Sequence, residues 1–303
     1  MTRAARRFLP ISLIAVMALM VPAGATPAVS AARIIDQLPE DCEEFVPESL
    51  GFSGLTDDGR TVSLDVRVLL DFAEGAGIEQ MRLEAQGEPN ETLRAQILAE
   101  AQALHQAQID RATGLLDSAI GSYAPFDIDF KMTGFEFLQP LKADGTPRNR
   151  TVDAQSIINL AKDQFGGQRP AGSDIVYVLT DLDMTAPGLG NLVAGLADCI
   201  GGVRYPNRAF GVGEISEDIP IGPVTFYYEA TAKIAAHEVG HLMGAHHHYQ
   251  NCVEGIPSEL VEAGEPSPCT LMTNAVDFQS LNFGQIEGLA VRGHAVDFAD
   301  NPA

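Results

Sequence analysis

Residues 237–247 read HEVGHLMGAHH, and their spacing indicates a metal site. His237 and His241 are four residues apart, so on a helix both imidazoles lie on one face and can point at one ion. Gly244 can adopt the left-handed conformation that ends a helix, which would return the chain so that His247 supplies a third ligand. Three histidines leave the fourth position of a tetrahedral zinc ion open, which is typical of a catalytic site.

Glu238 directly follows the first histidine and is placed to polarise a water molecule on that metal. We expect it to be the catalytic general base, which takes the proton of the attacking water and passes it to a leaving group. A helix with surface histidines is the competing interpretation, but these five fixed positions rarely coincide in a chain of ordinary composition.

The spacing HExxHxxGxxH is the signature of the metzincin metallopeptidases, and this chain resembles that clan. The resemblance implies one catalytic zinc, a protein or peptide substrate and a buried methionine turn beneath the metal. Met272, in the sequence CTLM, is the candidate for that turn. A cysteine stands shortly before this methionine, and in this feature the chain resembles the reprolysin (adamalysin) branch. A tyrosine that reaches the metal in astacins and serralysins is replaced by Asn274, so the turn is expected to supply no further ligand.

The segment before the active helix, residues 195–214, also resembles the reprolysins, which carry a double-glycine edge strand followed by a short Gly-Val strand. The resemblance implies that the substrate lies antiparallel to the residues around the double glycine, namely Ile200, Gly201, Gly202 and Val203. A bulge or tight bend at the two glycines is the alternative. Two positions depart from the reprolysin pattern: His248 stands where an aspartate usually follows the third ligand, and no proline follows the methionine turn.

Apolar periodicity predicts alternating strands and helices, an α/β (mixed α+β) pattern. Strands are predicted near residues 61–70, 126–132, 175–179, 197–204 and 209–215, and helices near residues 89–120, 153–165, 226–244 and 282–298. The resemblance implies the zincin-like metzincin fold. That fold has a twisted, mostly parallel mixed sheet with one antiparallel edge strand, two long packing helices, an active-site helix and a C-terminal helix.

The N-terminus has the pattern of an export signal, predicted over residues 1–25 with a possible later cut after residue 31. Three arginines precede an apolar run, Phe8–Val21, that is shorter than the ~20 residues a membrane span needs. We therefore expect a secreted protein without a membrane span. Residues 26–58 are predicted to form an N-terminal extension and residues 59–303 the catalytic domain.

The formal net charge is −22, which argues against nucleic acid and anionic membranes as partners. The hydrophobic content of 46% supports a real core, and we expect a monomer. Asp181 and Asp183 follow a predicted strand, where a turn or a calcium ion would both account for them; no further calcium ligands are evident.

The chain has four cysteines, and an even count in an exported protein suggests two disulfides. Cys252 and Cys269 both lie between the third histidine and the methionine turn, so that a Cys252–Cys269 bond would brace this loop and leave Cys42 to pair with Cys199. A latency thiol at Cys42, as in matrixin propeptides, is the alternative, although the flanking sequence lacks the basic residue and glycine found there.

Three functions are compatible with these features. The first is a zinc endopeptidase, the second a zinc-dependent hydrolase of a non-peptide substrate, and the third a non-catalytic binding protein that keeps the fold. The third histidine and the methionine turn count against the second, and the intact Glu238 counts against the third.

Overall fold

The computed structural model describes residues 40–42, 60–186, 190, 193–216, 220–221, 224–225, 229–247, 252–253, 267–273 and 281–299. The chain divides into two compact units, Met1–Ala31 and Ala32–Ala303, and every described residue belongs to the second. The predicted signal peptide, His248 and Asn274 lie outside the described residues.

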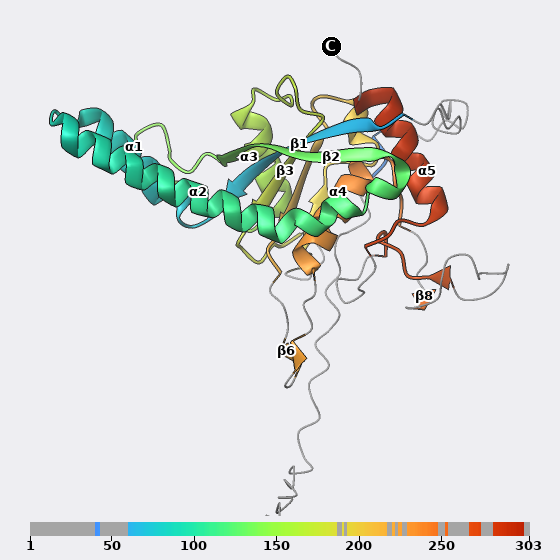
Figure 1. Cartoon of the computed structure of the whole chain (residues 1–303). Helices are drawn as coiled ribbons and strands as arrows, with labels where there is room; N and C mark the ends of the chain where they lie inside the picture. The colour runs from blue at the N-terminus through green and yellow to red at the C-terminus, as the bar shows by residue number, and fades with distance from the viewer. Residues whose placement is uncertain are drawn as a thin grey trace, which may run out of the picture. The chain divides into compact units, whose positions relative to one another are not determined.

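A five-stranded mixed sheet is the central element of the second unit (Figure 1). Its strands lie in the order β2-β1-β3-β5-β4. Their bounds are β1 Val62–Asp71, β2 Ile128–Phe137, β3 Ile175–Thr180, β4 Gly195–Ala197 and β5 Phe210–Glu214. Neighbours pair in parallel except β4, which pairs antiparallel with β5. The predicted sheet, mostly parallel with one antiparallel edge strand, is confirmed.

Helices cover both faces of this sheet. They are α1 Gly75–Gly87, α2 Glu91–Gly121, α3 Ala154–Gln164, α4 Ala230–Leu242 and α5 Gln285–His294. Short turns are η3 Ala124–Phe126, η4 Gly202–Arg204 and the π-helical η6 Ala295–Ala299, and short strands are β6 Pro220–Ile221, β7 Val224–Thr225, β8 Cys252–Val253 and β9 Ser267–Pro268. The core residues of α2, α4 and α5 gather on one face, and those of α3 on the other.

Two of the predicted helices begin at polar side chains that cap them. The Asn90 carboxamide accepts hydrogen bonds from the backbone N–H groups of Thr92 and Leu93 at the start of α2. The Asp153 carboxylate accepts one from the N–H of Ser156 at the start of α3. The helix α1 was not predicted, because few apolar residues mark a face along it and it is held by packing against α2.

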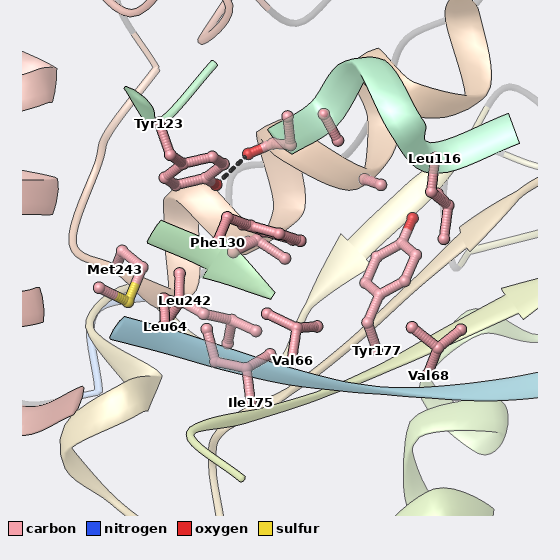
Figure 2. Close-up of a cluster of buried hydrophobic side chains, with 14 of the residues drawn as sticks. Leu64, Val66, Val68, Leu116, Tyr123, Phe130, Ile175, Tyr177, Leu242 and Met243 are labelled. Carbon is pink, nitrogen blue, oxygen red and sulfur yellow. Dashed lines mark hydrogen bonds between the residues drawn. The ribbon is translucent and has the colours of Figure 1, made fainter. Parts of the chain in front are cut away.

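Alternate residues of the central strands supply the two halves of the core. Tyr177 and Val66 face α2 and α4, whereas Val176 and Val178 face α3. Figure 2 shows the first half, in which the Tyr123 hydroxyl donates a hydrogen bond to a backbone carbonyl of α4. These contacts hold α4 firmly against the sheet.

Within the described part of the chain, no helix has the length and apolar character that crossing a membrane requires.

Candidate metal centre

The helix α4 carries three of the predicted site residues, His237, Glu238 and His241, and all of its residues are buried. Its sequence, ATAKIAAHEVGHL, is rich in alanine, which has a high helix propensity and allows neighbouring elements to approach closely. The helix contacts α2, β4 and β5, so the two histidines leave it from a rigid support.

Gly244 turns the chain directly after α4. Its φ is 86°, in the left-handed region that favours glycine, and its N–H donates to the carbonyl of His241 at 2.9 Å. The N–H of Ala245 donates to the carbonyl of Gly240 at 2.9 Å, which completes a Schellman motif. A side chain at position 244 would also collide with the ring of His294. This turn brings His247 back towards the helix.

The three imidazoles of His237, His241 and His247 meet at their Nε2 atoms, which lie 3.0, 3.1 and 3.2 Å apart. The Nδ1 atom of His237 lies 2.8 Å from the carbonyl oxygen of Leu271, and that of His241 lies 2.7 Å from the carbonyl of Ala245. A carbonyl can only accept, so in the neutral form of each ring Nδ1 carries the proton and Nε2 presents a lone pair. Lone pairs that converge in this way favour a cation between them.

These positions fit a zinc ion. Ligand nitrogens at 2.0–2.1 Å from a tetrahedral zinc would lie about 3.3 Å apart, close to the spacing of the three Nε2 atoms. Among the described residues, this trio is the one group of histidine, cysteine and acidic side chains close enough to share an ion. The backbone carbonyls behind two of the rings act as the outer partners that orient metal-binding histidines.

Met272 is fully buried in a turn against α4. A Cβ at Gly240 would lie 3.0 Å from its sulfur, so this glycine lets the turn approach the helix between the two histidines. The Thr270 hydroxyl accepts from the N–H of Met272 and donates to the buried carboxylate of Glu287 in α5, both at 3.2 Å. The turn thus connects α5 to the Leu271 carbonyl that orients His237.

Glu238 is fully buried, and its side chain lies against Gly195 in the edge strand β4. A Cβ at Gly195 would lie 2.8 Å from both Cγ and Cδ of Glu238. The carboxylate therefore occupies the space that a larger residue in β4 would fill.

Residues 40–42 lie beside the site. The N–H of Cys42 donates to the carbonyl of Ile200, whose own N–H donates to the carbonyl of Glu40. A disulfide joins Cys42 to Cys199, and Asp41 pairs with His246, the neighbour of the third histidine, at 3.3 Å.

Cys269 is also disulfide-bonded. The side chain of Cys252 lies outside the described residues, so the Cys252–Cys269 bond stays a prediction. The backbone of Cys252 in β8 pairs with Ser267, two residues before Cys269.

The predicted edge strand at residues 200–203 is wrong. Ile200 bridges to Asp41, Gly201 has a φ of 78°, and Gly202–Arg204 forms the turn η4. The antiparallel edge strand is β4, and the double glycine is a tight bend. The sequence carries a signal for β4, because small residues stand at the alternate positions Gly195 and Ala197. The residues opposite them in β5, Gly213 and Gly211, are also small.

Asp181 has a structural role at the end of β3. Its carboxylate pairs with Arg150 and accepts a hydrogen bond from the N–H of Ala73. Arg150 also pairs with the buried Asp71. Asp181 is thus part of an ion-pair network that ties the ends of β1 and β3.

The mixed sheet with its antiparallel edge strand is consistent with a metzincin fold, and the converging histidines occupy the positions that the metzincin signature predicts. Residues 106–248 match the family model described as Metallo-peptidase family M12B Reprolysin-like. The match confirms the predicted resemblance to the reprolysin branch of the metzincins. No curated protein matches the chain. The family suggests a metallopeptidase.

Proposed function

We propose that this protein is a secreted zinc endopeptidase with His237, His241 and His247 as the metal ligands and Glu238 as the general base. The convergence of three imidazole Nε2 atoms at 3.0–3.2 Å carries this proposal. The M12B match and the signature spacing support the class of reaction. When bound, zinc supplies a coordinated water with a pKa of about 7 and polarises the scissile carbonyl.

The chain's own contribution is the placement of a carboxylate next to the first metal ligand. Glu238 would accept the proton of the attacking water on its carboxylate and deliver it to the departing amine. The complete burial of the side chain keeps bulk water from competing for this proton.

We propose that the peptide substrate aligns along β4. This strand pairs with β5 on one side and is last in the described sheet order. An extended peptide can pair with such an edge through main-chain hydrogen bonds. Glu238 lies against the same strand, so one element would position both the substrate and the base.

A quenched-fluorescence peptide library tests the reaction, with and without a zinc chelator. We expect cleavage by the purified protein that the chelator abolishes and that added zinc restores. Cleavage that survives complete metal removal would contradict the metal assignment, and activity towards esters but not peptides would favour the non-peptide hydrolase.

Glu238→Gln tests the general base. We expect a loss of turnover beyond the ~10²–10⁴ typical of general acid–base catalysis, because the water also loses its hydrogen-bonding anchor. Metal analysis should still find about one zinc per molecule. Retained proteolysis would contradict the mechanism, and loss of zinc would show that Glu238 is needed for metal binding.

Secretion is tested separately by the N-terminal sequence of the protein recovered from the culture medium. We expect the mature chain to begin at Thr26 or Ala32, after one of the two predicted cleavage sites. Protein confined to the cells with its first residues intact would contradict secretion.

A further inference from the structure

The contact between Gly195 and Glu238 is unusually specific. The three nearest atoms that a Cβ at Gly195 would meet all belong to Glu238: Oε1, Cδ and Cγ. The last two would lie at 2.8 Å, well inside van der Waals contact. The space left by the missing side chain at position 195 is therefore filled by the side chain of Glu238 in α4.

The backbone at Gly195 does not itself demand glycine. This residue is not among the glycines with positive φ, so its conformation is open to alanine. Gly211, in the neighbouring strand, offers a contrast, because a Cβ there would meet its nearest atom, Cδ1 of Leu242, at an ordinary 3.4 Å. Contact with Glu238 is thus the steric reason for glycine at position 195.

The carboxylate has little room to move aside. Glu238 is fully buried, and the space above Gly213, which pairs directly with Gly195, is filled by the hydroxyl of Tyr177. A methyl group at position 195 would therefore have to displace the Glu238 side chain from its present place against β4.

We propose that Gly195 is a positioning residue for Glu238: its missing side chain sets the distance between the carboxylate and β4. The inference rests on the proposed function. Because β4 is also the strand along which the substrate would align, Gly195 fixes the base relative to the bond that is cut. An error of about 1 Å in such a placement can cost about 10²-fold in rate.

The kinetic test compares Gly195→Ala with the matched variant Gly211→Ala. For Gly195→Ala we expect kcat to fall roughly 10- to 100-fold while KM stays within about twofold, because the base and not the substrate contact is displaced. Zinc content should stay at that of the wild type. Gly211→Ala should keep kcat. An unchanged kcat in Gly195→Ala, or loss of zinc along with activity, would overturn the proposal.

A second measurement needs no turnover. Melting temperatures of the metal-free protein are compared for Gly195→Ala in the wild type and in Glu238→Ala, which removes all three contacting atoms. We expect a lower melting temperature only where Glu238 is present. An equal loss in both backgrounds would overturn the contact. If the wild type cleaves no peptide, the proposed function fails, but this comparison still decides whether Gly195 holds Glu238.

Discussion

Two buried tyrosines show how differently a single hydroxyl group can act in this core. Tyr123 donates to the carbonyl of Ala236 in α4 at 2.7 Å, whereas the Tyr177 hydroxyl has no hydrogen-bond partner among the described residues. Burial, and secondly the charge of Glu238, raises the pKa of each phenol well above its usual value. Both hydroxyls therefore stay protonated at neutral pH, and the presence or absence of a hydrogen-bond partner distinguishes their contributions to stability.

Replacing each tyrosine by phenylalanine should separate these two cases. Tyr123→Phe should lower the free energy of unfolding by about 1 kcal/mol, because a buried hydrogen bond is lost. Tyr177→Phe should leave it unchanged or raise it by up to about 1 kcal/mol, because a buried polar group without a partner is removed. Urea denaturation measures both. A larger loss for Tyr177→Phe than for Tyr123→Phe would contradict this assignment.

At the scale of elements, the site depends on how α5 supports the methionine turn. The carbonyl of Asn282 accepts from the N–H of Leu271, and Glu287 accepts from the Thr270 hydroxyl. Gly284 lies against the carboxylate of Glu287 and leaves it room. The orientation of His237 is thus set by hydrogen bonds that begin in the C-terminal helix, far from it in sequence.

Thr270→Val should expose this dependence. The substitution removes the acceptor for the Met272 N–H and the donor to Glu287, so we expect a loss of about 1–3 kcal/mol in unfolding free energy. Zinc affinity should fall about 10- to 100-fold, as is typical when outer partners of metal ligands are lost. Competition with a fluorescent zinc chelator measures the affinity.

Thr270→Ser is the matched control, because it keeps the hydroxyl and should keep zinc affinity near that of the wild type. An equal loss of affinity in both variants would show that the methyl packing of Thr270 matters and not its hydrogen bonds.

At the scale of the whole molecule, the disulfide between Cys42 and Cys199 connects residues separated by 157 positions in the sequence. It fastens residues 40–42 beside Ile200, and the N–H of the following Gly201 donates to the carbonyl of His241 at 2.9 Å. Residues 40–42 are thereby linked to the C-terminal end of α4.

Replacing both Cys42 and Cys199 by serine should destabilise the fold strongly. Chain-entropy models give roughly 5 kcal/mol for a loop of this length, against roughly 3 kcal/mol for the 18-residue loop of the predicted Cys252–Cys269 bond. Urea denaturation under non-reducing conditions compares the two double-serine variants. A smaller loss for Cys42 and Cys199 than for the other pair would contradict the expected order.

The sequence alone predicted that His237, His241 and His247 would meet. Two of them are four residues apart on one helix, and helical geometry fixes their relation without reference to other elements. The turn at Gly244 could likewise be predicted from the sequence, since a helix end that returns the chain needs a left-handed residue. The central strands and the capped helices α2 and α3 followed from apolar periodicity and polar caps, which are also local signals.

Only the tertiary structure decided the features that depend on which segments meet. The edge strand is β4 and not residues 200–203, because register in the sheet decides which segment pairs with β5. The backbone of Ile200 instead forms hydrogen bonds with residues 40–42. The Leu271 carbonyl behind His237 and the space that Gly195 leaves for Glu238 likewise depend on long-range contacts. Every residue type has a backbone carbonyl, and a glycine in the sequence does not reveal which side chain will fill the space beside it. The support of the site therefore became visible only in the fold.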